Sequence, residues 1–334
     1  MNGARGERGV ALIVVLWVIM VLSLLIGGFA FSMHVETQVA SFGRKEQKAA
    51  ALARAGVEVA RWQLLEHLKS PKDGGFDALN QAWFTNEEFY VNHALGDGTF
   101  SVQVEDEEQR LPINQLTEEQ WLRLFEALGV EATEGEAMMD CILDWTDDND
   151  LHRLNGAESD YYLQLPQPYR AKDGPFDRVE ELLLVKGMTR ELFEGLPAAK
   201  ADEAGRPGLR DLLTTISSGR VNVNTATALA LHVMFDLDEA QLQGVLARRN
   251  GPDGVAGTED DQPYQNVEEF VREVATTDVE QAAQCRAGAT VKSTAFRVTA
   301  TGNVNGVKRS VIATLRLQGS EYLVAAWEER RLGQ

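Results

Sequence analysis

The sequence predicts an α+β fold: a long N-terminal helix with a small antiparallel sheet, interrupted by a large all-helical insertion. Three observations predict it. An uncharged apolar run near the N-terminus continues without proline into an amphipathic helix. Strand-like alternation occurs at 99–105 and again close to the C-terminus, and the 334-residue chain reads as almost wholly helical in between. This length is enough for two domains beyond the N-terminal helix.

The N-terminal run predicts a membrane-spanning helix. No charged residue occurs between Arg8 and His34, and at about 1.5 Å per residue such a helix crosses a hydrocarbon core of roughly 30 Å. A secretory signal has an apolar segment of only about 7–15 residues and a cleavage site behind it. Here the run is longer and no ordinary cleavage site follows. The basic leader, with Arg5 and Arg8, predicts a cytoplasmic N-terminus.

The helix is expected to continue beyond the membrane. From Glu36 to Lys69 there is no proline, and Pro71 then ends the pattern. Apolar residues recur at steps of three and four, as one buried stripe requires. They are Ala49, Leu52, Ala53, Val57, Ala60, Leu64 and Leu68. The alternative is a signal anchor followed by an unrelated helix, but the unbroken sequence favours one long helix.

The β part is predicted from both ends of the chain. Residues 99–105 alternate apolar and polar. Near the C-terminus, 295–302 and 307–317 flank Asn303-Val-Asn-Gly306, which is a hairpin turn signal, and 322–326 adds an edge strand. We therefore expect one small antiparallel sheet packed on the N-terminal helix.

Composition narrows the function. The formal net charge is −19, and removing the leader, with two arginines and one glutamate, leaves −20. Such a charge repels nucleic acid and anionic lipid and attracts divalent cations. The five histidines are scattered, and no zinc-protease, serine-hydrolase or phosphate-loop motif occurs, so we expect no enzyme. Cys141 and Cys285 either form a disulfide or remain buried thiols.

A dense acidic segment is the candidate metal site. Calcium prefers six to eight oxygen ligands, and crowded carboxylates resist folding without a cation between them. The expected ligands are Asp144, Asp147, Asp148, Asp150, Glu158 and Asp160. The spacing is not that of an EF-hand, and the alternative is a solvated acidic loop. A second acidic loop, 253–261, is a weaker candidate, for which the solvated loop is favoured.

One segment indicates a different class of protein. Residues 221–226, with the segments after them, resemble the helix-hairpin-helix domains of DNA-uptake proteins, which bind phosphate through a glycine-rich turn. The corresponding turn here, 234–239, lacks glycine and carries three carboxylates, so it would repel phosphate. We therefore expect no binding of nucleic acid.

Taken in order, several motifs resemble the K-type minor pseudopilins of type II secretion, the general secretion pathway protein K family. The resemblance covers nearly the whole chain and rests on 8–17, 104–107, 112–114, 143–148, 156–162, 184–188 and 221–226. It implies a pilin-like fold with a calcium-binding helical insertion. It also implies a subunit that caps a periplasmic pseudopilus with I-type and J-type subunits, above H-type and major pseudopilins, anchored in the inner membrane. Prepilin peptidase would cut between Gly9 and Val10 and methylate the new amine.

This interpretation divides the chain into five parts. They are a leader (1–9), a transmembrane helix (10–33), the stalk helix with the first β part (34–112), the inserted helical domain (113–290) and the C-terminal β part (291–334). Most prepilins have glutamate at the fifth mature position, where this chain has Val14. That glutamate neutralises a neighbour's amine in an apolar core, so its absence suits a subunit at the tip. The rival interpretation is a signal-anchored periplasmic protein with a DNA-uptake or enzymatic role.

Overall fold

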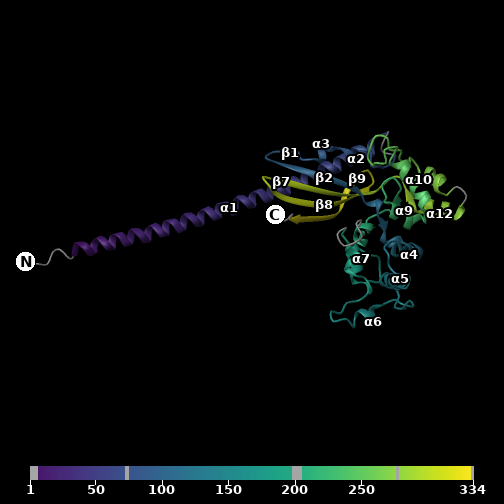
Figure 1. Cartoon of the computed structure of the whole chain (residues 1–334), viewed down its shortest axis with the longest axis horizontal. Coiled ribbons are helices and arrows are strands. Elements are labelled where there is room, and N and C mark those ends of the chain that lie inside the picture. The colour runs from purple at the N-terminus through teal and green to yellow at the C-terminus, as the bar shows by residue number, and fades with distance from the viewer. Residues whose placement is uncertain (1–6, 72–74, 198–204, 276–277, 332–334) are drawn as a thin grey trace, which may run out of the picture.

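The computed structural model describes residues 7–71, 75–197, 205–275 and 278–331 (Figure 1). The helices are α1 (Glu7–Lys69), α2 (Ala82–Thr85), α3 (Glu87–Tyr90), α4 (Glu118–Ala127), α5 (Ala132–Thr146), α6 (Ser159–Tyr162), α7 (Arg190–Glu194), α8 (Leu209–Leu212), α9 (Ala228–Phe235), α10 (Glu239–Arg249), α11 (Val267–Val274) and α12 (Val279–Gly288), with short 3-10 helices η1 (Glu107–Gln109), η2 (Ile113–Gln115) and η3 (Val179–Leu184). The strands are β1 (His93–Leu95), β2 (Gly98–Asp106), β3 (Leu111–Pro112), β4 (Leu213–Thr214), β5 (Val221–Asn222), β6 (Ala289–Thr290), β7 (Ala295–Val304), β8 (Val307–Gln318) and β9 (Glu321–Arg331).

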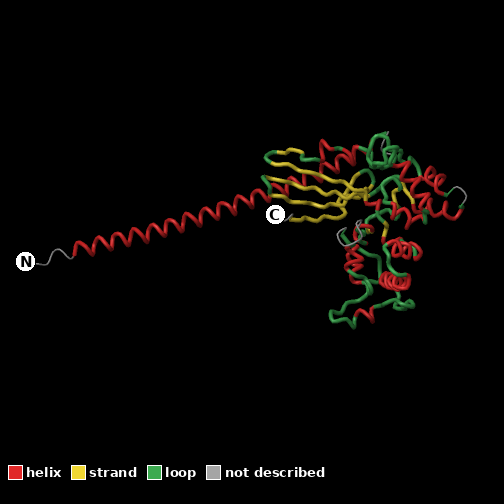
Figure 2. Tube along the Cα trace, in the orientation of Figure 1, coloured by secondary structure: helices red, strands yellow, loops and turns green. Residues whose placement is uncertain are grey.

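One unbroken helix of 63 residues, α1, covers the predicted transmembrane and stalk segments. This confirms a single continuous helix. Its N-terminal half projects away from the rest of the molecule (Figures 1 and 2). The most apolar 18-residue window has a mean hydropathy of 2.9 and contains no buried residue, so by length and composition this helix is able to cross a membrane.

The C-terminal half of α1 packs on a five-stranded sheet. The strand order is β1-β2-β7-β8-β9, and every neighbouring pair is antiparallel. The expected apolar stripe of α1 lies in the core with the inward side chains of the sheet. Its buried members are Ala49, Leu52, Ala53, Val57, Ala60 and Leu64. A Cβ on Gly302 of β7 would overlap the backbone of α1, so glycine permits this close approach.

Partner helices would be able to pack along this stripe only if the chain's own sheet left it uncovered. The sheet covers it, so these residues are not available to other subunits. The predicted hairpin is confirmed: Asn305 and Gly306 both have positive φ angles, as a tight turn between twisted strands requires. The expected edge strand is also present, as β9.

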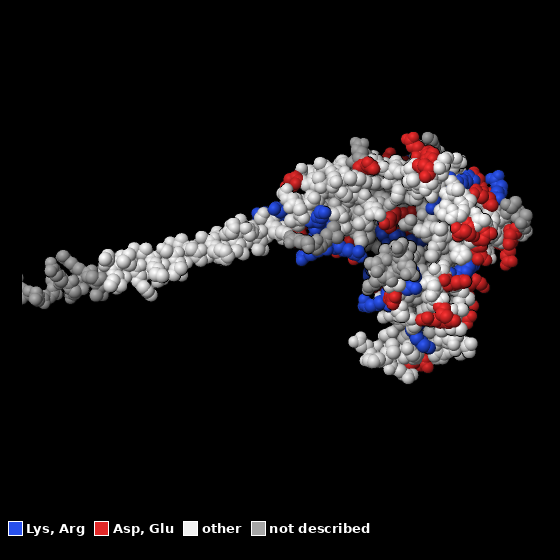
Figure 3. Space-filling view, in the orientation of Figure 1, with Lys and Arg blue, Asp and Glu red and all other residues white. Residues whose placement is uncertain are grey.

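The helical part is inserted between β2 and β7 and extends from the end of the sheet farthest from the N-terminus (Figures 1 and 2). Its helices surround a core of their own, and two pairs of two-residue parallel strands, β3 with β4 and β5 with β6, tie distant segments together. Carboxylate side chains gather on this part of the surface, whereas the projecting stalk is almost uniformly uncharged (Figure 3).

Two local features complete the insertion. The helix α9 has Thr227 as its N-cap, and the Thr227 side chain accepts a hydrogen bond from the backbone N–H of Ala230. Cys141 and Cys285 are both buried free thiols, which decides the question that the sequence left open.

Candidate metal centre in the inserted helical part

The last turn of α5 and the start of α6 bring three carboxylates together. Asp144 lies on the inward side of α5 and is fully buried, and Asp147 is the C-cap of the same helix. Glu158 is the N-cap residue of α6 and is 1% exposed. One oxygen from each of the three lies within 4.8 Å of the others. The predicted acidic segment therefore folds into a compact oxygen cluster.

The cluster has unused acceptor capacity. Both carboxylate oxygens of Glu158 are buried and lack a hydrogen-bond partner within the described residues. Asp144 accepts from the backbone N–H of Arg153 at 3.3 and 3.2 Å, and the Arg153 guanidinium lies 3.9 Å from it. Leaving a buried carboxylate without donors costs about 1–3 kcal/mol or more. A bound cation would remove that cost.

Burial and mutual repulsion change the acidity of the cluster. Burial raises the pKa of Asp144, with the Asp147 charge adding to the effect. The pKa of Glu158 is raised to about 7, first by burial and then by the charges of Asp144 and Asp147. This is the pattern expected when like charges share a site that a cation would otherwise neutralise.

The surrounding chain holds the cluster in place. A Cβ at Gly156 would overlap the Asp144 carboxylate, so only glycine leaves room for the acid there. Trp145 packs edge-on against Tyr162 with ring centroids 5.1 Å apart. Lys186 bonds the carbonyl of Gly156 at 3.2 Å. These contacts fix both segments that supply carboxylates.

The other three expected ligands lie outside the cluster. Asp148 and Asp150 are exposed, and Asp160 pairs instead with His152, 3.1 Å from its Nε2. The second acidic loop uses its carboxylates internally, since Asp261 accepts from the N–H of Gly257 and Asp260 from that of Asp253. Within the described ranges, no second cluster of three potential ligands of this kind is found.

The cluster suits a hard divalent cation. Three carboxylates supply fewer oxygens than the six to eight that calcium prefers, so carbonyls or waters would complete the shell. The sequence analysis did not identify the roles of Gly156, which leaves room for the Asp144 carboxylate, and of Arg153, whose backbone N–H donates to it. The Asn155-Gly156 pair was an available signal, since such pairs mark tight turns.

The expected processing residues lie at the other end of the molecule. Gly9 and Val10 belong to the first turns of α1, and Arg5 of the leader lies outside the described residues. Cleavage after Gly9 stays a prediction.

An N-terminal helix long and apolar enough to cross a membrane, an antiparallel sheet packed on its second half and a helical insertion between two strands define a pilin-like protein. A family model described as "Type II secretion system (T2SS), protein K" matches residues 93–199. Type II secretion system protein K of Pseudomonas aeruginosa is 27% identical over 77% of this chain and 76% of its own length. The protein of the same name from Pectobacterium carotovorum is 30% identical over 39% of this chain and 37% of its own length.

A solved structure shares the fold. A chain in the crystal structure of the GspK-GspI-GspJ complex from enterotoxigenic Escherichia coli is 19% identical, with a TM-score of 0.67. The match covers 88% of this chain and all of the other. The chain is thus similar to type II secretion system protein K in sequence and in fold, and these similarities support the function of a minor pseudopilin. In the turn between α9 and α10, the Asp236 carboxylate lies 4.0 Å from the Arg123 guanidinium. The alternative of a DNA-uptake protein is not favoured, because the similar proteins are type II secretion proteins.

Proposed function

We propose that this subunit stands at the tip of the periplasmic pseudopilus, held in the inner membrane by α1, where it starts the filament together with I-type and J-type subunits. In this proposal it has no catalytic role. The main support for a tip position is the placement of the insertion, which extends from the end of the stalk farthest from the predicted membrane segment (Figure 1). A body as large as an ordinary domain would clash if it were repeated along a thin helical filament.

Two further observations support a tip position. The structural relative was solved in a complex with GspI and GspJ. Val14 places no carboxylate in the apolar part of α1, where other prepilins have a glutamate for the neighbour's amine. H-type and major pseudopilins would then lie below this subunit, and prepilin peptidase would trim it at Gly9 and methylate Val10.

Partner helices need a surface other than the covered stripe. Below the sheet, α1 exposes Val35, Val39 and Phe42, spaced by four and three residues on one side of the helix. Apolar side chains in this arrangement suit the stalk helices of neighbouring subunits.

The calcium site is part of the same proposal. Asp144, Asp147 and Glu158 would bind structural calcium, which would hold the loop between α5 and α6 in place. The supporting observation is the buried Glu158 carboxylate without a hydrogen-bond partner in the described structure. Asp148, Asp150 and Asp160 would act at most through waters or after a local rearrangement.

Co-purification of full-length chains tests the partner proposal. With I-type and J-type subunits co-expressed and extracted in detergent, Phe42→Glu should reduce recovery of the complex at least tenfold, because it places a charge in an apolar helix contact. Thr37→Glu adds the same charge on the opposite side of the helix and serves as the control. Equal recovery of both variants would exclude this surface.

A further inference from the structure

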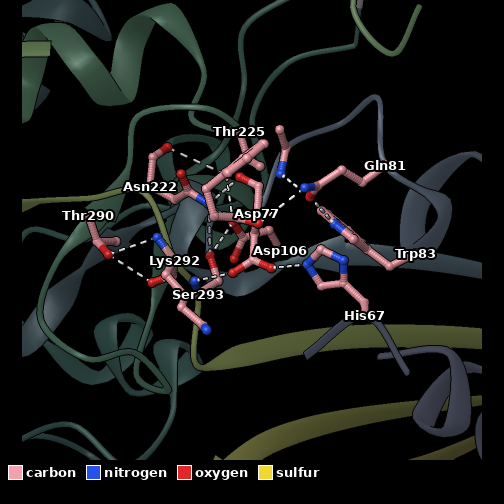
Figure 4. A network of polar contacts seen from close by, with 12 residues as sticks. His67, Asp77, Gln81, Trp83, Asp106, Asn222, Thr225, Thr290, Lys292 and Ser293 are labelled. Carbon is pink, nitrogen blue, oxygen red and sulfur yellow. Dashed lines mark hydrogen bonds and ion pairs between the residues drawn. The ribbon is translucent and has the colours of Figure 1, made fainter. Parts of the chain in front are cut away.

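A buried polar cluster lies where the chain leaves the sheet for the insertion and returns from it (Figure 4). Its centre is Asp106 at the end of β2, only 1% exposed. Its Oδ2 atom accepts from Asn222 Nδ2 at 2.9 Å, Thr225 Oγ1 at 2.6 Å and Ser293 Oγ at 2.6 Å. Its Oδ1 atom accepts from the backbone N–H of Glu108 at 2.8 Å.

The donors come from parts of the chain that are far apart in sequence. Asn222 and Thr225 belong to the insertion, and Ser293 lies just before β7. The stalk joins through Asp77, which is 2.7 Å from His67 Nε2 and accepts from the backbone N–H of Ser293 at 2.6 Å. One carboxylate therefore fastens the insertion to the sheet and, through Asp77, to the stalk (Figure 4).

All four donors to Asp106 are neutral, so no direct contact among them offsets its charge. The titratable groups that face it are Glu108 from η1, Asp77 from the segment after α1, and Tyr322 from β9. Burial, followed by the charge of Glu108, raises the pKa of Asp106 to about 7. Glu107, the residue after Asp106, forms ion pairs with Arg297 and Arg110.

The protonated cluster keeps its hydrogen bonds. When Oδ2 carries a proton, it is able to donate a hydrogen bond to Thr225 Oγ1, and the Thr225 hydroxyl is then able to donate to the carbonyl of Asn222, 3.4 Å away. The neutral acid thus loses its buried charge and leaves no donor without a partner. Ionisation at the same place costs free energy unless the junction opens to water.

We propose that Asp106 is a proton-linked clamp between the sheet and the insertion, tightest when its carboxyl group is protonated and looser when that group is ionised. The direction of the pH effect follows from the linkage between proton binding and the closed state. A carboxyl group with a raised pKa in the closed state stabilises that state fully below its ordinary pKa, and the contribution is lost as the pH rises through about 7. The orientation of the insertion on the stalk would then depend on pH.

Hydrogen exchange of the full chain in detergent tests the clamp. Peptides covering 106–110, 222–226 and 291–295 should open about tenfold more often at pH 8 than at pH 6, after correction for intrinsic rates, if the pKa lies near 7 in the closed state. Peptides from 144–158 report separately on the metal site. Equal opening at the two pH values would overturn the proposal.

Variants sharpen the test. Asp106→Asn is neutral at all pH values and should abolish the tenfold difference, whereas Asp97→Asn, on the exposed turn of the same sheet beside Lys48, should keep it. Should Asp106→Asn fail to fold, Thr225→Val removes one donor that stabilises the carboxylate, and the midpoint of the pH dependence should move upward. An unchanged pH dependence in Asp106→Asn, or an unchanged midpoint in Thr225→Val, would contradict the clamp.

Discussion

Replacing Glu158 by glutamine should have opposite effects with and without calcium. In the metal-free protein at pH 8, the ionised Glu158 is buried, has no hydrogen-bond partner in the described structure and lies beside Asp144 and Asp147. Glutamine has nearly the same shape, removes the charge, and offers an amide that is able to donate to the neighbouring carboxylates. The variant should therefore be more stable than the wild type when calcium is absent.

The size of the effect follows from the acidity of the site. The pKa of Glu158 rises from 4.5 to about 7, and at 1.36 kcal/mol per unit this corresponds to at most about 3 kcal/mol. For the wild type, calcium at a hundred times its Kd should add about 2.7 kcal/mol. A hundredfold loss of affinity in the variant would reduce that gain to about 0.4 kcal/mol at the same calcium concentration.

Thermal unfolding of the full chain in detergent, with calcium and with chelator, measures both effects. One kcal/mol corresponds to roughly 2–4 °C for a body of this size. Glu126→Gln makes the same chemical change on the exposed side of α4 and should leave both melting temperatures unchanged. A Glu158→Gln protein that is less stable without calcium, or that gains as much from calcium as the wild type, would refute the reasoning.

Two further predictions concern the metal site, and a third concerns processing at Gly9. Gly156→Ala should displace the Asp144 carboxylate and lower the free energy of unfolding by about 1–3 kcal/mol. It should also weaken calcium binding at least tenfold in calorimetry, and an unchanged Kd would show that Gly156 does not shape the site. Calcium affinity should be about tenfold higher at pH 8 than at pH 6, because the pKa of Glu158 near 7 makes protons compete with the ion; a flat profile in isothermal titration would contradict that pKa. Gly9→Leu should leave an uncleaved precursor in the membrane, because a side chain beside the scissile bond obstructs the close backbone approach that glycine allows; mass spectrometry of a normally trimmed variant would exclude Gly9 as the recognition residue.

Much of the fold could be predicted because its signals are local. The helix runs to Lys69 and stops before Pro71, and the Asn305-Gly306 turn sets the register of β7 on β8. By contrast, β2 pairs with β7 across the whole insertion, and no local pattern specifies that partner. The same long-range pairing decides that the stalk stripe is covered by the chain's own sheet and is closed to other subunits.

The candidate site was predictable only in part. Charge density along the sequence located the acidic segment, but it does not say which side chains point inward. Asp144 and Glu158 turn inward because α5 and α6 bury those faces, while Asp148 and Asp150 remain in solvent. The Asp106 cluster was missed because the side chains that donate to Asp106 are 116 to 187 residues away from it in sequence, and singly each resembles an ordinary polar residue.

In the proposed assembly, this subunit caps the pseudopilus and does not extend it. The most direct measurement is the native mass of the complex formed when full-length I-type, J-type and K-type chains are co-expressed and extracted together. A single discrete species with one copy of each chain is predicted. Polymers that contain many copies of this chain, or an I–J pair that excludes it, would contradict the account.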